Sequence, residues 1–330
     1  MIIDGVRHSM RAVAALAILA VWAVAGGAFA QTYPAKPIRL VVGFAPGGAA
    51  DTVARAYGDQ LGRALGQPIV IENRAGAGSS IAAENVAHSA PDGYSVLIAS
   101  PASISVNPAL NPKLNYKPSD LAPIIKVSSS PLLLVVNPTT GINSVKDLIA
   151  VAKKDPDKLN YATSGVGSAP HFGAVLFSQM TGIKMTHVPF KGGAPAVMSV
   201  VAGDTQVTFA TPPSVLPMVK AGRLHALAVT NRDRSALMPE IPGMAEAGVA
   251  DFALAFWYGF FVPAGTPPEI VKKIFDATMI AAQRPEVKAT LAREGTEIAV
   301  SRSPEDFAAF LAEDAKFWVK LVKDSGATAD

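Results

Sequence analysis

The sequence predicts an α/β protein with two lobes, and three observations support this prediction. Short apolar runs of strand type alternate with helical patterns along most of the chain, which is typical of α/β folds with parallel sheets. Two glycine-rich turns, 44–51 and 163–171, each follow an expected strand and lead into an expected helix. Two extended segments, near Ser130 and near Asp251, can cross between the lobes and act as hinges.

The expected strands are short runs rich in Val, Ile and Leu. In chain order they are 38–43, 68–72, 95–99, 121–127, 132–136, a strand at Leu159, 185–188, 206–210, 224–229 and 256–262. Helices are expected between these strands, because apolar residues there recur with helical spacing, as they do at Val53, Tyr57 and Leu61. The C-terminal quarter is expected to be mostly helical, with helices that start near Thr266 and Ser303.

The N-terminus has the pattern of an export signal. Arg7 and Arg11 precede an uncharged, apolar stretch, 12–30, that ends in Ala-Phe-Ala. A basic start, an apolar middle and a small-residue end are typical of a secretory signal peptide. A membrane anchor is the alternative, because the apolar run is just long enough to span a bilayer. We expect residues 1–30 to be a signal peptide that is cleaved after Ala30, and Met10 is an alternative start.

Composition and charge narrow the function classes. Without the signal, 300 of the 330 residues remain, enough for two domains. The formal net charge then falls from +3 to +2, because Arg7, Arg11 and Asp4 leave together. This near balance argues against nucleic acid as a partner, since nucleic-acid binding uses a concentrated basic surface. Cysteine is absent from the sequence, which excludes disulfides, thiolate metal sites and a cysteine nucleophile.

The two glycine-rich turns predict a binding site for an anion. A glycine turn that leads into a helix leaves the first backbone N–H groups free, with the positive end of the helix dipole behind them. Such a site can hold a carboxylate without a charged side chain. One turn in each half of the chain suggests a ligand carboxylate held from both sides of a cleft. The alternative is two ordinary strand-to-helix loops.

Motifs for catalysis are absent from the sequence. It has no G-x-S-x-G, H-E-x-x-H or Walker A sequence, and no complete dinucleotide fingerprint. His171 follows Ser164 and Ser168 and could serve as a base for a serine, although a role in lining a pocket is favoured. His187 and His225 lie in or beside apolar strands and are expected to be core residues. We expect no enzyme activity, no cofactor and no metal.

Several short motifs are distributed over essentially the whole mature chain. They are YPAKPIRLVV at 33–42, FAPGG followed by Asp at 44–51, ENRAGAG at 72–78, PDGY at 91–94, KLNYA at 158–162, HVPFKG at 187–192, VKAGRL at 219–224 and PAGTP at 263–267. In this combination the chain resembles the Bug family (TctC-like), the extracytoplasmic solute receptors of tripartite tricarboxylate transporters. The resemblance implies a type II periplasmic-binding-protein fold: two α/β lobes, a ligand cleft and two hinge crossings.

The resemblance also implies the limits of the lobes and the residues of the site. Lobe I comprises 31–129 and 252–330, and lobe II comprises 130–251. In the family, the two glycine turns hold a ligand carboxylate, partly through ordered water. The site residues that this implies are Phe44, Pro46, Gly47, Gly48, Asp51, Ser100 and Pro101 in lobe I, and Thr163, Ser164, Gly165, Ser168, His171 and Thr211 in lobe II.

Two departures from the family's pattern bear on the ligand. Ala49 and Ala50 stand where the family often has hydroxyl residues, so backbone N–H groups or water must supply the donors there. The sequence Phe-Ala-Thr at 209–211 stands where the family often has Phe-Asp-Asn, so an acidic partner for a ligand ammonium is missing. Because an unpaired buried ammonium is unfavourable, we expect a dicarboxylate or an aromatic acid.

The function that follows is that of a monomeric periplasmic solute receptor. It is expected to capture a carboxylate-bearing organic acid between its lobes and to deliver it to the membrane permease of a tripartite tricarboxylate transporter. One alternative is a ligand-sensing periplasmic subunit that acts on a signalling partner. The other is an exported enzyme of organic-acid metabolism, which the absence of a nucleophile–base pair disfavours.

Overall fold

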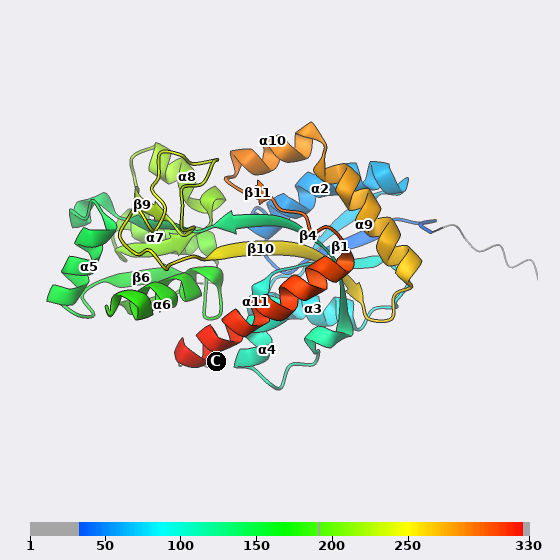
Figure 1. Cartoon of the computed structure of the whole chain (residues 1–330), viewed down its shortest axis with the longest axis horizontal. Coiled ribbons are helices and arrows are strands. Elements are labelled where there is room, and N and C mark those ends of the chain that lie inside the picture. The colour runs from blue at the N-terminus through cyan, green and yellow to red at the C-terminus, as the bar shows by residue number, and fades with distance from the viewer. Residues whose placement is uncertain (1–32, 191, 326–330) are drawn as a thin grey trace, which may run out of the picture. The chain divides into compact units, whose positions relative to one another are not determined.

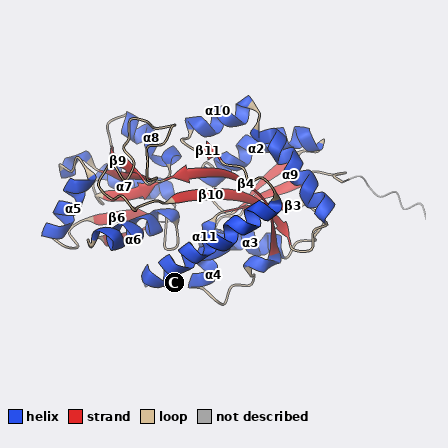
Figure 2. Ribbon diagram, viewed as in Figure 1, coloured by secondary structure: helices blue, strands red, loops and turns tan. Residues whose placement is uncertain are grey.

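The computed structural model describes residues 33–190 and 192–325, so the expected signal peptide lies outside the described residues. The described chain contains two β-sheets with helices packed against them (Figures 1 and 2). The predicted α/β class with two sheet-containing lobes is therefore confirmed. Within the described residues, no helix combines the length and the apolar character needed to cross a membrane.

The first sheet has the strand order β11-β4-β10-β3-β1-β2. Its strands are β1 (Ile38–Val42), β2 (Ile69–Asn73), β3 (Ser95–Ala99), β4 (Leu121–Pro131), β10 (Ala255–Pro263) and β11 (Glu297–Ile298). Strand β1 is parallel to β2 and β3, whereas β10 is antiparallel to β3 and β4. Strand β11 is antiparallel to β4 at the edge.

The second sheet has the strand order β7-β6-β8-β5-β9. Its strands are β5 (Leu133–Val136), β6 (Asn160–Thr163), β7 (Thr186–Pro189), β8 (Val207–Ala210) and β9 (His225–Val229). Strand β6 is parallel to β7 and β8, whereas β5 is antiparallel to β8 and β9.

The helices fall into two groups, one for each sheet. Those associated with the first sheet are α2 (Ala49–Leu65), α3 (Ser80–Ala87), α4 (Asn107–Leu110), α9 (Pro268–Ala282), α10 (Pro285–Arg293) and α11 (Pro304–Ser325). Those associated with the second are α5 (Val145–Lys154), α6 (Ala169–Thr181), α7 (Gly193–Ala202) and α8 (Pro212–Lys220). Short helical turns are η1 (Ala77–Ser79), η2 (Ala102–Val106), η3 (Pro118–Asp120) and η4 (Pro138–Thr140).

The expected parallel pairs are present, but both sheets are mixed. In the second sheet β5 is antiparallel to both its neighbours, and in the first the strands that connect the two sheets run in opposite directions. Strand β4 leads out of the first sheet and is followed directly by β5 of the second, and β10 returns. The outgoing and returning strands pair antiparallel, from Ala255 opposite Pro131 to Pro263 opposite Leu121. Figure 1 shows them side by side. The lobe limits at 129/130 and 251/252 stay a prediction.

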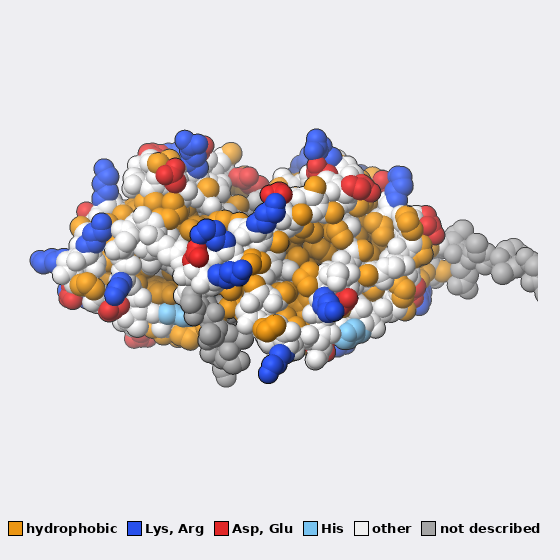
Figure 3. All heavy atoms as spheres, turned by 60° about the horizontal axis from the view of Figure 1, so that its bottom comes forward, with side chains coloured by type: hydrophobic (Ala, Val, Ile, Leu, Met, Phe, Trp, Pro, Cys, Tyr) orange, Lys and Arg blue, Asp and Glu red, His pale blue; other side chains and the backbone are white. Residues whose placement is uncertain are grey.

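Each sheet packs its own hydrophobic core against its helices. The core of the first sheet includes Val41, Leu97, Trp257, Phe261 and Phe307, all at most 1% exposed. The core of the second includes residues of β5, β6 and β8 together with α7 and α8. On the face shown in Figure 3, basic and acidic side chains are interspersed.

Candidate ligand-binding site

In the first sheet, the predicted site residues follow strands that end at one edge. Val42, the last residue of β1, lies opposite both Asn73 at the end of β2 and Ile98 near the end of β3. The first glycine turn, the segment after β2 and Ser100 therefore start from the same edge. In α/β proteins, ligands bind outside this carboxyl edge of parallel strands.

The second sheet has the same arrangement. Thr163 at the end of β6 lies opposite Pro189 at the end of β7, and Ala162 lies opposite Thr208 of β8. The carboxyl edge of these strands therefore carries the second glycine turn, the chain after β7, and Thr211 after β8. Each sheet thus presents its predicted site residues at one edge.

Asp51 fixes the conformation of the first glycine turn. The Asp51 carboxylate accepts hydrogen bonds from the Gly47 N–H at 2.9 Å, from Arg55 Nε at 2.8 Å and from Asn73 Nδ2 at 2.9 Å. Asn73 Nδ2 also donates to the Phe44 carbonyl at 3.1 Å. Burial by itself raises the pKa of Asp51, but the bonds from Arg55, Gly47 and Asn73 together lower it below its usual value. Asp51 is thus an ionised, buried residue that holds the turn together.

The free backbone donors of this turn lie at the start of α2. Gly47 adopts a φ of +78° and uses its N–H on Asp51, and the Gly48 N–H points to the Ala45 carbonyl at 3.3 Å. Gly48 is the N-cap of α2 and provides no side-chain cap. Within the described residues, no hydrogen bond uses the N–H groups of Ala49 and Ala50. These two groups are therefore available to an anion, with the helix dipole behind them.

The second glycine turn is held by hydroxyl groups. The Gly165 N–H donates to Thr163 Oγ1 at 3.2 Å, and Ser168 Oγ donates to the Gly165 carbonyl at 2.6 Å. Thr163 Oγ1 also lies 2.7 Å from His187 Nε2. Gly165 has a φ of +118°, a backbone conformation that favours glycine. Within the described residues, the N–H of Ala169 at the start of α6 has no acceptor, so it is one free donor on this side.

His171 is buried behind this turn as a neutral side chain. Its Nδ1 accepts a hydrogen bond from the Gly167 N–H at 3.4 Å. Its ring stacks on that of His187 with a centroid distance of 4.5 Å, and His187 stacks on Tyr161 at 5.0 Å. Burial, and then the neighbouring His187, lower the pKa of His171 to about 4. Because Ser168 donates to a backbone carbonyl, the geometry does not pair it with His171 as nucleophile and base.

The expectations for the other two histidines were wrong. His187 is half-buried and contacts Thr163 and His171 of the second turn, so it belongs to the candidate site and not to the core. His225 is exposed at the start of β9. A polar residue in a short, apolar run fits either side of a strand, so the sequence pattern could not place these two side chains.

Asn107 of α4 lies beside the predicted site residues, and sequence reasoning did not include it among them. Its Nδ2 donates to the carbonyls of Ala77 and Gly78 at 3.1 and 2.8 Å, and it lies 2.9 Å from Ser80 Oγ. On its other side, a Cβ built on Gly167 would lie 3.2 Å from Asn107 Oδ1. Asn107 therefore connects the turn after β2 in the first sheet with the second glycine turn of the other sheet.

The remaining predicted residues have different surroundings. Ser100 is completely buried, and its hydroxyl has no hydrogen-bond partner within the described residues. Pro101 is buried at the start of η2. Thr211 is half-buried at the N-cap of α8, where its Oγ1 lies 3.1 Å from Ser214 Oγ. Phe209 is fully buried against Phe177, so it belongs to the core and not to a ligand surface.

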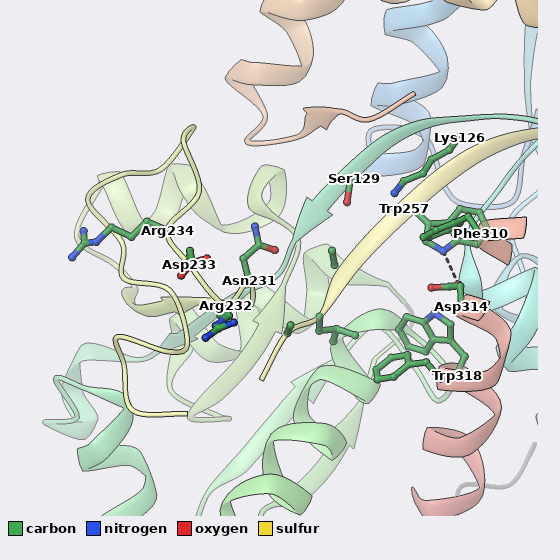
Figure 4. Close-up of a pocket in the computed structure, with 14 residues that line it drawn as sticks. Lys126, Ser129, Asn231, Arg232, Asp233, Arg234, Trp257, Phe310, Asp314 and Trp318 are labelled. Carbon is green, nitrogen blue, oxygen red and sulfur yellow. Dashed lines mark hydrogen bonds between the residues drawn. The ribbon is translucent and has the colours of Figure 1, made fainter. Parts of the chain in front are cut away.

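Two hollows lie around these elements, and one of them borders the first glycine turn. One, of about 630 Å³, lies between α2 and α10 and includes Pro46, Gly47 and Asp51 on its wall. The other, of about 460 Å³, lies beside the crossing strands and contains none of the predicted site residues (Figure 4).

The hollow in Figure 4 is lined by aromatic side chains of β10 and α11 and by charged side chains of both signs, among them Lys126 and Asp314. Trp257 Nε1 donates to Asp314 at 2.8 Å, and Lys126 Nζ lies 4.4 Å from the centre of the Phe310 ring. Burial lowers the pKa of Lys126 and raises that of Asp314, and the attraction between the two opposes both shifts. Within the described residues, no group of three or more His, Cys, Asp or Glu side chains is arranged to hold a metal ion.

Comparison with known proteins assigns a family to this arrangement. A sequence model described as the tripartite tricarboxylate transporter family receptor, TctC, matches residues 53–327. The chain is 36% identical to the protein BugT of Bordetella pertussis over 306 residues, which cover 92% of this chain and 94% of BugT. It is 33% identical over 282 residues to a second Bordetella pertussis protein of the UPF0065 group, with 86% of this chain and 87% of the relative covered.

Solved structures share the fold over most of this chain. An R. palustris protein solved with adipate has a TM-score of 0.84 and 34% identity, and the match covers 89% of this chain and 98% of that one. MatC from Rhodopseudomonas palustris with bound malate has a TM-score of 0.80 and 31% identity, with 88% and 100% covered. The periplasmic binding protein BugD has a TM-score of 0.81 and 29% identity, with 90% and 100% covered.

Proposed function

Since this chain belongs to the tripartite tricarboxylate transporter receptor family, we propose that it captures an organic acid with at least one carboxylate in the periplasm and delivers it to a membrane permease. It is a solute-binding receptor of the TctC/Bug type. The observation that carries the ligand class is the pair of similar structures that hold adipate and malate, both dicarboxylates, at 34% and 31% identity.

The geometry supports a carboxylate at each carboxyl edge. On the first sheet, the free N–H groups of Ala49 and Ala50 lie at the positive end of α2. On the second, the free N–H of Ala169 lies at the start of α6. Hydrogen bonds to a charged group contribute about 1.5–3 kcal/mol each, so three or four of them are comparable with the ~8 kcal/mol of a micromolar complex before the costs of binding. The side chains of the two turns then act mainly by fixing the backbone.

The same geometry supports binding without catalysis. The hydroxyls of Thr163 and Ser168 are used within their own turn, and His171 is a neutral acceptor for the Gly167 N–H. These groups are arranged to hold a loop in place. Groups that stabilise a turn in this way are not free to act as nucleophile or base. A receptor that only binds its ligand requires no such groups.

Isothermal titration calorimetry on the purified mature chain tests the ligand class. The probes are adipate, malate and succinate, each compared with its diamide. We expect micromolar or tighter binding of at least one diacid and none of its diamide. If the amides bind as well as the acids, the carboxylate assignment is wrong.

Uptake assays test whether the receptor works with a membrane permease. Cells that lack the receptor gene should lose uptake of the radiolabelled diacid that calorimetry identifies, and the wild-type gene should restore it. If the cells keep full uptake but lose a transcriptional response to the acid, the protein is a sensing subunit and not a transport receptor.

A further inference from the structure

Ser79 combines two unfavourable features at one position. It has a φ of +77°, in the left-handed region that glycine adopts far more easily than serine. It is also completely buried, and its hydroxyl has no hydrogen-bond partner within the described residues. Burying an unpaired hydroxyl is unfavourable. A glycine here would avoid both features, so the serine needs another explanation.

The surroundings of Ser79 place it at the carboxyl edge of the first sheet. It is the N-cap of α3 and directly follows Ala77 and Gly78, whose carbonyls bond to Asn107. Its hydroxyl lies next to Gly43 just after β1, because a Cβ built on Gly43 would lie 1.8 Å from Ser79 Oγ. Ser79 is therefore adjacent both to the first glycine turn and to the contact with the second sheet.

A second unpaired hydroxyl lies on the other side of β1. Strand β1 lies between β2 and β3 in the sheet. Ser79 belongs to the segment that follows β2, and Ser100 directly follows β3. Both hydroxyls are buried without a partner within the described residues. Two unpaired donors at the same sheet edge as the free N–H groups of Ala49 and Ala50 are suited to one oxygen-rich, anionic group.

We propose that Ser79 is a ligand-binding residue whose hydroxyl donates to a carboxylate of the bound acid, with Ser100 as a second donor. This inference rests on the proposed function and adds a specificity-determining residue to it. The bound carboxylate supplies the acceptor that the hydroxyl lacks, which explains why a strained serine stands where glycine would be relaxed. A Ser79 hydroxyl that meets only a buried water molecule is the competing explanation.

Two substitutions separate the hydroxyl from the backbone strain. Ser79→Ala removes the hydroxyl and keeps the strain, whereas Ser79→Gly removes both. We expect both variants to bind the diacid about tenfold or more weakly by calorimetry, as the loss of a hydrogen bond to a charged group implies. Because Ser79→Gly relieves strain, its Tm without ligand should be no lower than that of the wild type.

A matched control variant tests whether relief of backbone strain by itself changes the affinity. Asp157 also has a positive φ, +64°, and is exposed between α5 and β6. Asp157→Gly relieves comparable strain far along the chain from Ser79, so it should leave the affinity for the diacid unchanged. The affinities are measured with malate, adipate and succinate for all variants.

The outcomes distinguish the explanations. Unchanged affinity in Ser79→Ala and Ser79→Gly would show that the hydroxyl binds water only and would overturn the proposal. A loss in Ser79→Gly but not in Ser79→Ala would assign the effect to the backbone and would also overturn it. A loss with malate alone would identify the ligand's hydroxyl as the partner and contradict the carboxylate assignment. Wild-type protein that binds no diacid contradicts the proposed function itself, before any variant is made.

Discussion

Gly167 lies directly against the side chain of Asn107, and this contact joins the second glycine turn to the first sheet. A Cβ built on Gly167 would lie 3.2 Å from Asn107 Oδ1 and 3.3 Å from Leu110 Cδ1. Asn107 in turn holds the carbonyls of Ala77 and Gly78 after β2. The two carboxyl edges that carry the predicted site residues therefore meet at Gly167, which lies against Asn107 and Leu110.

The first prediction concerns this contact. Gly167→Ala should weaken diacid binding by about tenfold, because the added methyl group separates the two edges. Gly167 also has a φ of +78°, so the variant should lose about 1–2 kcal/mol of unfolding free energy from backbone strain alone. Calorimetry with the diacid and urea unfolding measure the two effects.

Gly141→Ala is the matched control for that experiment. Gly141 has a similar φ of +69°, and a Cβ built on it would have no atom within 4 Å. This variant should lose a similar amount of stability and keep its affinity. Equal affinity in the two variants would show that the Gly167 contact has no role in binding.

The second prediction assigns Asp51 a structural role in the first turn. Both of its oxygens accept hydrogen bonds, from Gly47, Arg55 and Asn73. Asp51→Asn keeps the shape and one acceptor, so it should lower the unfolding free energy by about 1–3 kcal/mol. Asp51→Leu removes the acceptor of all three donors and should cost more stability and more affinity. Urea unfolding and calorimetry compare the two.

Arg55→Gln is the control for the charge of that site. The Arg55 side chain is 55% exposed, so removal of its ion pair should change stability by less than about 1 kcal/mol. Equal losses of affinity in Asp51→Asn and Asp51→Leu would instead indicate that the carboxylate binds a cationic group of the ligand.

The sequence predicts those features of this structure that depend on neighbouring residues, and it does not predict those that depend on residues far apart in the chain. The two glycine turns, their strands and their helices follow from local patterns, and all are present. The antiparallel pairing of β4 with β10 and the position of Asn107 depend on segments far apart in the chain. Asn107 bonds to residues about 30 positions earlier and contacts a glycine in the other sheet, which no local pattern indicates.

The sequence also could not predict which backbone N–H groups are free to bind an anion. Sequence reasoning located an anion site at Gly47, Gly48 and Gly165, but the N–H groups of these residues bond within their own turns. The free donors lie one or more residues further, at Ala49, Ala50 and Ala169. Glycine spacing predicts that a turn precedes a helix, whereas the acceptors inside the turn are set by side chains such as Asp51 and Thr163.

The third prediction concerns the pH dependence that His171 produces. Its pKa is lowered to about 4 in the folded chain from an ordinary value of 6.5. As pH falls below 6.5, the unfolded chain takes up a proton that the folded chain does not, so stability falls until about pH 4. At pH 5 the loss relative to pH 7 is about 2 kcal/mol from this residue.

His171→Asn should remove this loss and keep an acceptor for the Gly167 N–H. Urea unfolding at pH 7 and pH 5 measures the difference for the wild type and the variant. His225→Asn, a substitution of an exposed histidine, serves as the control and should retain the wild-type difference. If His171→Asn loses as much stability between pH 7 and pH 5 as the wild type does, another group accounts for the effect.

The last prediction is that the ligand has no ammonium group. Asp51 already accepts hydrogen bonds from three donors: Gly47 in its own turn, Arg55 in α2 and Asn73 at the end of β2. Asp204 is exposed and precedes β8, at the opposite end of that strand from Thr211. Neither carboxylate is therefore available to a ligand ammonium, and burying an ammonium without a partner costs several kcal/mol. Malate and aspartate make a matched pair, because they differ only by a hydroxyl in place of the ammonium. Calorimetry should show malate bound at least tenfold more tightly than aspartate, and a preference for aspartate would refute this prediction while leaving the receptor assignment in place.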